Sequence, residues 1–126
     1  MVVEGLLYTK EHEWAKIEGD VATVGITDYA QEQLGEVTFV ELPDLEKEFR
    51  AQEELAVVES SKAASDVYSL VTGRTTEVNS ELESRPELVN EDCYGAGWIC
   101  KMTITDSKSI DELMDARQYE EYLKGL

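Results

Sequence analysis

One lysine stands out for the chemistry that its surroundings allow. Lys62 lies between two strand-like stretches, Leu55–Glu59 and Val67–Val71. Its neighbours are all small, and they are Ser60, Ser61, Ala63, Ala64 and Ser65. This pattern predicts a lysine at or near the tip of a hairpin, where a modifying enzyme can reach its amine. The alternatives are a solvated turn lysine and a Schiff-base nucleophile, although the latter usually needs desolvated surroundings.

Other side-chain chemistry finds little support in the sequence. His12 is the single histidine, so the chain has neither an HExxH motif nor a histidine cluster for catalytic zinc. Cys93 and Cys100 are too few for a disulfide scaffold, and we expect both to be reduced thiols. The glycine-rich phosphate loops GxGxxG and GxxxxGK[ST] are missing as well. An enzyme built on common catalytic side chains is therefore a poor fit, and we predict no metal site.

The charge balance excludes several classes of partner. The 126 residues include 11 Lys and Arg against 28 Asp and Glu, which gives a formal net charge of −17. Nucleic-acid binding and docking on anionic membranes both need clustered basic residues, so neither is expected. No apolar run approaches the ~20 residues of a membrane-spanning helix, and the first residues lack the pattern of a signal or transit peptide. With 42% hydrophobic residues spread along its length, the chain can form one folded domain.

Short β-strands are predicted to position the lysine. Stretches rich in β-branched and aromatic residues predict strands at Trp14–Ile17, Val21–Ile26, Val37–Leu42, Leu55–Glu59, Val67–Val71, Thr75–Val78 and Trp98–Ile104. Turns are expected at 18–20, 42–44 and 72–74. Short helices are expected at Tyr29–Leu34, capped by Thr27 and Asp28 and ended by Gly35, and at Pro86–Asn90, with a C-terminal helix over about 110–124. Seven strands in so short a chain predict a small sandwich or flattened barrel.

The segment around Lys62 resembles the lipoylation segment of the glycine cleavage system H protein. Five further blocks, in the family's order, are similar to it: residues 8–14, 24–36 and 40–43, then 87–92 with Gly97-Trp98, and 113–116 leading to Tyr119. The resemblance implies a mainly β fold, a barrel-sandwich hybrid of the lipoyl- and biotinyl-carrier type, with peripheral helices and one lipoyl-carrier domain over residues 1–126. Biotinyl carriers usually have methionines beside the lysine, and this chain has Ser61 and Ala63 there.

The resemblance further implies a non-catalytic carrier with lipoate in amide linkage on Lys62. Such an arm shuttles the aminomethyl group of glycine from a pyridoxal-phosphate glycine decarboxylase to a tetrahydrofolate-dependent aminomethyltransferase. A dihydrolipoamide dehydrogenase then reoxidises it, and a lipoate ligase or lipoyltransferase attaches it. The resemblance also implies a monomer with transient docking, cytoplasmic in bacteria and in the mitochondrial matrix in eukaryotes.

Several other residues receive expected roles from the same resemblance. Glu59, Ser61, Ala63 and Asp66 are expected around the lipoyl attachment site. Glu13, Gln33 and Leu34 are expected to contact the loaded arm, with Glu13 and Asp66 as carboxylate partners for a protonated terminal amine. Ordinary surface acidity is the alternative for both carboxylates.

Four turn positions depart from the family pattern. Glu46 and Gln52 replace usual glycines, and Leu70 and Cys93 replace usual prolines. Three alternatives stay open beside the glycine cleavage carrier, and the altered turns motivate the first of them. They are a carrier that donates lipoate to 2-oxoacid dehydrogenases, an enzyme using Lys62 as a Schiff-base nucleophile, and a non-modified acidic interaction module.

Overall fold

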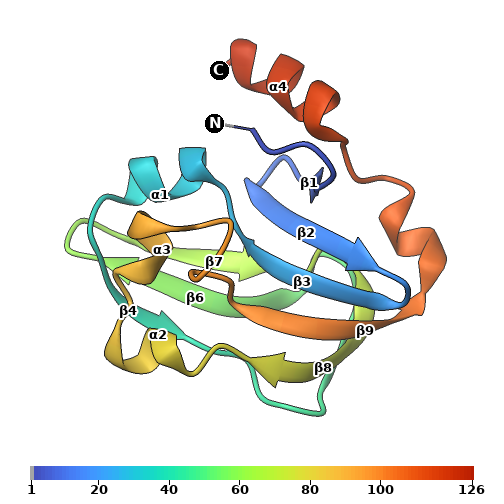
Figure 1. The fold of residues 1–126 in the computed structure, drawn as a ribbon, viewed down its shortest axis with the longest axis horizontal. Coiled ribbons are helices and arrows are strands. Elements are labelled where there is room, and N and C mark those ends of the chain that lie inside the picture. Colours follow the sequence, from blue (N-terminus) through green and yellow to red (C-terminus); the bar gives the residue numbers. More distant parts are fainter. Residues whose placement is uncertain (1) are drawn as a thin grey trace.

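Two antiparallel sheets make up most of the molecule, which a computed structural model describes for residues 2–126. The six-stranded sheet has the order β1-β2-β3-β9-β8-β5 and the three-stranded sheet the order β4-β6-β7 (Figure 1). The strands are β1 Leu7–Tyr8, β2 Glu13–Glu18, β3 Val21–Ile26, β4 Val37–Glu41, β5 Glu48–Phe49, β6 Glu54–Ser60, β7 Ala64–Tyr68, β8 Thr72–Val78 and β9 Cys100–Asp106. This arrangement confirms the predicted mainly β fold with two antiparallel sheets.

Short helices lie at the margins of the sheets. They are α1 Asp28–Leu34, α2 Glu81–Ser84, α3 Leu88–Glu91, the 3-10 turn η1 Ser107–Ile110 and α4 Ala116–Lys124. Helix α1 begins at Asp28, one residue before the predicted start, and ends at Leu34 as predicted. The Thr27 side chain accepts a hydrogen bond from the Ala30 amide, and Gly35 closes the last turn. A capping box between Asp115 and Gln118 starts α4.

The main core forms between the two sheets. Its fully buried side chains are mostly aliphatic and include Val24, Val58, Val71, Leu82, Val89, Ile99 and Met102. Gly73 lies inside β8, where it pairs with Phe49 and Ile104. A Cβ at Gly73 would collide with the backbone carbonyl of Thr103. The absence of a side chain therefore allows β8 and β9 to pack closely at this point. The turn predicted at 72–74 is therefore wrong.

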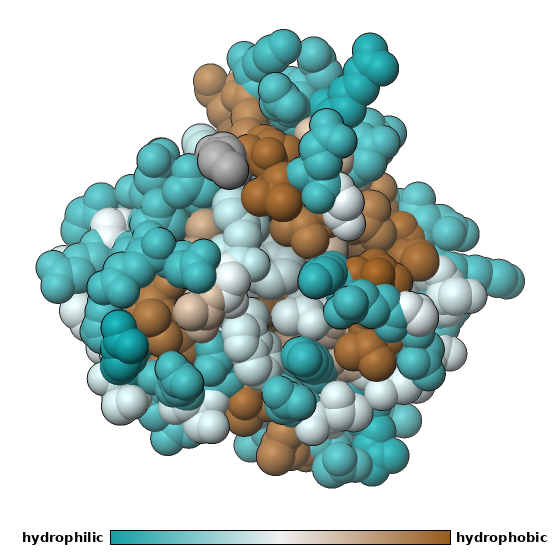
Figure 2. Space-filling view, viewed as in Figure 1, coloured by the Kyte–Doolittle hydropathy of each residue, from teal (hydrophilic) through white to brown (hydrophobic). Residues whose placement is uncertain are grey.

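A second, aromatic cluster joins the N-terminal segment to α4. The rings of Tyr8 and Tyr119 stack with centroids 4.5 Å apart and an interplanar angle of 3°, beside the buried Trp14. Figure 2 shows hydrophobic atoms gathered just below α4, where Figure 1 places the N-terminal segment. The cluster explains why the predicted helix over 110–124 is too long. Met114 forms a β-bridge with Tyr8 and exchanges two backbone hydrogen bonds with it, so the helix begins only at Ala116.

One further strand prediction needs correction, and two short strands were not predicted at all. The strand predicted at Val67–Val71 lies earlier, at Ala64–Tyr68, because Leu70 and Val71 are buried in the connection to β8. The two-residue strands β1 and β5 carry too short a pattern to be predicted. Among the described residues, no helix is both long and apolar enough to cross a membrane.

Candidate functional site

Lys62 lies in the two-residue turn of the β6–β7 hairpin, as the sequence predicts. The Ser60 amide donates to the Ala63 carbonyl at 2.7 Å and closes the turn. The Ser60 hydroxyl oxygen accepts hydrogen bonds from the amides of Lys62 (3.2 Å) and Ala63 (3.1 Å). Ser61, Lys62 and Ala63 are exposed. The small residues thus form a tight turn that leaves the lysine amine open to solvent.

The Lys62 side chain lies against the C-terminal end of α1. Gly35 ends this helix with a φ of 80°, in the left-handed region that favours glycine. A Cβ at Gly35 would lie 3.1 Å from Lys62 Cε and 3.5 Å from Nζ. The Asn90 side chain holds Gly35 in place, because its Nδ2 donates to the Gly35 carbonyl at 2.8 Å. The missing side chain therefore leaves room for the lysine between the hairpin and α1.

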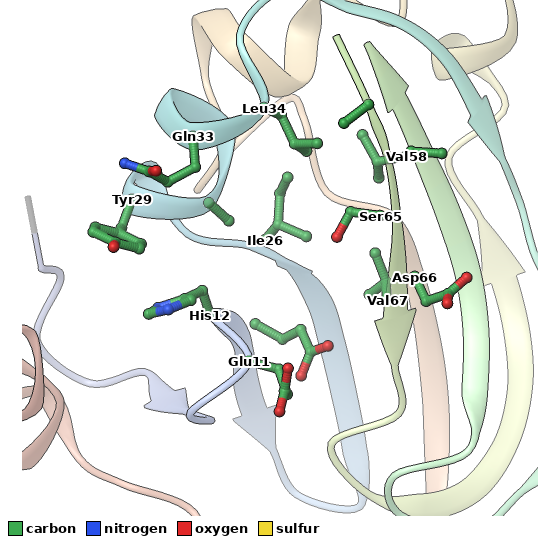
Figure 3. Close-up of a pocket in the computed structure, with 14 residues that line it drawn as sticks. Glu11, His12, Ile26, Tyr29, Gln33, Leu34, Val58, Ser65, Asp66 and Val67 are labelled. Atoms are coloured by element: carbon green, nitrogen blue, oxygen red, sulfur yellow. The ribbon is translucent and has the colours of Figure 1, made fainter. Parts of the chain in front are cut away.

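A cavity of about 310 Å³ opens beside this contact. Its walls come from α1, from Ile26 in β3 and Val58 in β6, from the loop that leads into β2, and from β7 (Figure 3). The lining residues are Glu11, His12, Glu13, Ile26, Tyr29, Ala30, Gln33, Leu34, Val58 and residues 63–67. Leu34 and Val58 face one another across it. The interior is largely apolar, so it suits an aliphatic chain better than a polar ligand.

Glu13 is the buried acid of this cavity, with 2% of its surface exposed. The Thr9 hydroxyl donates to Glu13 Oε1 at 2.7 Å, and the Tyr68 amide donates to Oε2 at 2.7 Å. Burial raises the pKa of the carboxyl to about 7, against the opposing effect of both hydrogen bonds. The carboxyl can therefore change its protonation state near neutral pH.

His12 forms the wall next to Glu13 and adopts a φ of 67°. Its ring lies 4.3 Å from that of Tyr29, and its Nδ1 is 2.8 Å from the Tyr119 hydroxyl oxygen. Burial lowers the pKa of His12, opposed by the negative charge of Glu11, so the ring is neutral at neutral pH. These contacts give His12 a structural place in the wall.

A second hollow of about 560 Å³ lies on the other side of Glu13. It is bounded by residues 8–11, by residues 51–52 and 68–70, and by the segment from Ser109 to Met114 that leads to α4. Sequence reasoning missed this hollow because four separated segments form it. No local pattern in the chain could have indicated it.

The structure brings some predicted site residues together and separates others. Gln33 and Leu34 line the same cavity as Glu13. Asp66 is among the lining residues, but Figure 3 shows its carboxylate pointing away from the side on which Ser65 and Val67 lie. Glu59 is opposite Ala64 in the ladder, two residues before the turn. Of the two predicted carboxylates, Glu13 is therefore the one that faces the cavity.

The altered turn positions are accommodated away from Lys62. Glu46 and Gln52 adopt φ values of 59° and 76°, so they keep the left-handed backbone that glycine would favour. Leu70 and Cys93 are buried, with their side chains in the cores. The departures from the family pattern thus leave the hairpin and the cavity intact.

Conventional catalytic groups do not gather at the site. Within residues 2–126, no cluster of His, Cys, Asp or Glu could hold a metal ion. Burial raises the pKa of Cys93 and of Cys100 to about 12, so both thiols stay protonated. What the site offers is an exposed lysine on a tight hairpin turn with an apolar cavity beside it. Fold and site together define a carrier domain, in which a tethered group does the chemistry.

Comparisons with known proteins identify which carrier this is. The profile of the family described as glycine cleavage H-protein matches residues 6–126, so the chain belongs to that family. It is 52% identical to the glycine cleavage system H protein of Parvibaculum lavamentivorans, over 94% of this chain and 95% of that protein. It is 54% identical to that of Thermus thermophilus, over 94% and 92% of the two chains.

A solved structure agrees with the fold. The crystal structure of the H protein from Mycobacterium marinum matches with a TM-score of 0.89 and 35% identity, covering 99% of this chain and 100% of that one. These findings confirm the predicted family, the fold class and the role as a non-catalytic lipoyl carrier of glycine cleavage. The family carries lipoyl-lysine, and its partners are glycine decarboxylase, aminomethyltransferase and dihydrolipoamide dehydrogenase.

Proposed function

We propose that Lys62 is the residue that carries lipoate and that the cavity beside it receives the far end of the arm. The single observation that carries this proposal is the contact between Lys62 and Gly35, which directs the lysine toward the cavity that both sheets share. An exposed amine on a tight turn supports modification by an enzyme. When bound, lipoate supplies a dithiolane that carries the cargo and the electrons.

The residues present fit such a group. The lysine stem and an acyl chain are both apolar, and the cavity wall between the turn and Glu13 includes Leu34, Val58 and Ile26. Burying such a chain in this wall removes apolar surface from water, at roughly 25 cal/mol per Å². Gln33 lies on α1 at the margin of the same wall. The chain therefore offers a shelter that keeps water away from whatever the arm carries.

Glu13 is the group that we assign to the cargo end of the arm. A protonated amine next to this buried carboxyl would favour its ionised form and form a charge-assisted hydrogen bond. The hydrogen bonds from Thr9 and Tyr68 hold the carboxyl in place for that contact. Asp66 stays a weaker candidate, because its carboxylate points away from the cavity.

Glu59, Ser61 and Ala63 serve as surroundings of the attachment site in this proposal. Ser61 and Ala63 flank the lysine without bulk, and Glu59 adds a charge at the base of the hairpin. We infer that residues 1–126 act as one carrier domain, since residues from both sheets line the cavity. The relatives named above are bacterial, which supports a cytoplasmic location over the mitochondrial alternative.

The altered turns are the feature that would favour a carrier for 2-oxoacid dehydrogenases as the alternative. Since the backbone at Glu46 and Gln52 is preserved, these turns no longer favour that alternative.

Mass spectrometry tests the proposal directly. The protein is co-expressed with a lipoate ligase, and its intact mass and peptide map are measured. We expect one lipoyl adduct, on Lys62, and none in Lys62→Arg. A matched Lys16→Arg variant, at an exposed position of β2, should be modified like the wild type. An adduct on another lysine, or no adduct in the wild type, would contradict the proposal.

A further inference from the structure

The outer face of the three-stranded sheet presents two rows of side chains to solvent. The strand pairing aligns Phe39 with Glu59, and Glu59 with Ala64, in the row nearest the turn. The next row contains Glu41, Val57 and Asp66. Directly paired residues share one face of a sheet, and successive residues along a strand alternate between the faces. Figure 3 agrees, because Asp66 points to the side opposite Ser65 and Val67.

This outer face has an apolar centre and an acidic margin. Phe39 is 50% exposed, and Val57 is half-buried beside it. Among the described residues, the carboxylates of Glu41, Glu59 and Asp66 form no ion pair or side-chain hydrogen bond. A single exposed phenylalanine needs no explanation by itself. An exposed aromatic surrounded by unpaired charges of one sign, however, has the composition of a protein interface with an apolar anchor and a charged rim.

The position of this face relative to Lys62 indicates which partner uses it. The row of Phe39, Glu59 and Ala64 lies immediately beside the turn that carries the lysine. Enzymes that act on the dithiolane meet the far end of a long flexible arm. The enzyme that attaches lipoate must instead bring its own active site to Nζ. Its contact surface therefore has to lie next to the hairpin.

We propose that the outer face of β4, β6 and β7 is the docking surface for the enzyme that acylates Lys62. The matching surface has an apolar socket for Phe39, bordered by Lys or Arg side chains. This inference rests on the proposed role of Lys62. In the reaction, the lysine amine attacks the carboxyl carbon of an activated lipoyl ester or anhydride. The N–C bond forms, the bond to the leaving group breaks, and the amine loses a proton.

Steady-state kinetics of lipoylation test the aromatic anchor. Wild type, Phe39→Ala and Leu45→Ala are compared as substrates of a lipoate ligase. Leu45 is the matched control, since it is 53% exposed and lies outside the sheet. We expect Phe39→Ala to raise KM about tenfold with kcat within about twofold, as for an interface anchor. Leu45→Ala should keep the wild-type KM, and equal melting temperatures would show that all three proteins are folded.

Ionic strength tests the acidic margin. The wild-type kcat/KM should fall as salt is raised, because exposed charges are screened. Glu41→Gln should weaken this dependence, whereas Glu120→Gln, exposed on α4, should leave it unchanged.

Each outcome decides between the proposals. If the wild type is acylated on Lys62 and Phe39→Ala keeps its KM, the docking surface is wrong while the role of Lys62 stands. If the wild type is not acylated on Lys62, the proposed function fails and the docking surface falls with it. If Phe39→Ala is lipoylated normally but, once lipoylated, is a poorer substrate of glycine decarboxylase, this face binds glycine decarboxylase. The acylating enzyme would then be the wrong partner for it.

Discussion

Glu13 Oε2 accepts a hydrogen bond from the Tyr68 amide at 2.7 Å, and this bond joins the two sheets beside the cavity. Glu13 begins β2 of the larger sheet, and Tyr68 ends β7 of the smaller one. Tyr68 lies on the outer edge of its sheet, where its amide needs a partner beyond the ladder. One buried carboxyl thus fixes the relative position of the sheets and faces the cavity that the arm is proposed to enter.

The first prediction concerns the pH dependence of stability. The pKa of Glu13 is raised to about 7 in the fold, from 4.5 in the unfolded chain. The folded state therefore holds a proton that the unfolded state releases between these values. The free energy of unfolding falls as pH rises through this window, by up to about 3 kcal/mol from this group. Glu13→Gln removes this contribution.

Urea unfolding of both proteins at pH 5 and pH 8 checks this prediction. The stability of the wild type relative to Glu13→Gln should decrease from the lower to the higher pH. The comparison with the variant cancels the repulsion among the other carboxylates. A difference between the two proteins that is the same at both pH values would contradict a raised pKa.

The second prediction concerns Thr9. Its hydroxyl donates to Glu13 Oε1 at 2.7 Å and stabilises the ionised carboxyl. Thr9→Val removes the donor, so the pKa of Glu13 should rise above its wild-type value, at a cost of about 1–2 kcal/mol in stability. Titration of the Glu13 carboxyl carbon by NMR measures the change. Thr76→Val, at an exposed position in β8, is the control and should leave the titration unchanged. A lower or unaltered pKa in Thr9→Val would argue against this role.

Much of the fold follows from local sequence. Strand β3 lies where its β-branched residues predict it, and α1 is bounded by Thr27 and Gly35. The small residues around Lys62 predict the hairpin turn because each removes a steric obstacle there. These features depend on interactions within a few residues, so the sequence alone is sufficient to predict them.

Tertiary contacts decide the features that could not be predicted. The segment before α4 has helical periodicity, yet Met114 pairs with Tyr8 instead. The glycine at position 73 is typical of a turn, but here it lies within β8 and lets this strand pack closely against β9. Glu13 belongs to a charged stretch that resembles surface, and only the meeting of both sheets buries it. The cavity likewise depends on segments that are far apart in the chain.

The third prediction concerns the strained turn at Gln52. Its φ of 76° lies in the left-handed region, which costs a residue other than glycine about 1–2 kcal/mol in stability. Gln52→Gly should raise the free energy of unfolding by about 0.5–1 kcal/mol, because relief of strain exceeds the added entropy of the unfolded chain. Gln52→Ala is the control, since it removes the same side chain and keeps the strain. Equal stability of the two variants in chemical denaturation would refute the prediction.

The fourth prediction concerns Tyr119, which connects α4 to the cavity wall. Its hydroxyl oxygen lies 2.8 Å from His12 Nδ1 and 2.9 Å from the buried hydroxyl of Thr27. Tyr119→Phe keeps the ring stack on Tyr8 but leaves both polar groups without this partner. We expect a loss of about 1–2 kcal/mol in stability. Amide hydrogen exchange should also become faster at His12, whose left-handed backbone depends on its surroundings.

Tyr122→Phe on the same helix is the matched control for Tyr119→Phe. The Tyr122 hydroxyl is exposed and donates to the Lys10 carbonyl at 3.4 Å, a long and weak bond. Its removal should cost less than about 0.5 kcal/mol, as for surface substitutions in general, and leave exchange at His12 unchanged. If both variants destabilise the protein equally, α4 packs on the aromatic cluster without positioning His12. A larger loss in Tyr119→Phe, together with faster exchange at His12, would establish that the C-terminal helix holds the wall of the cavity in place.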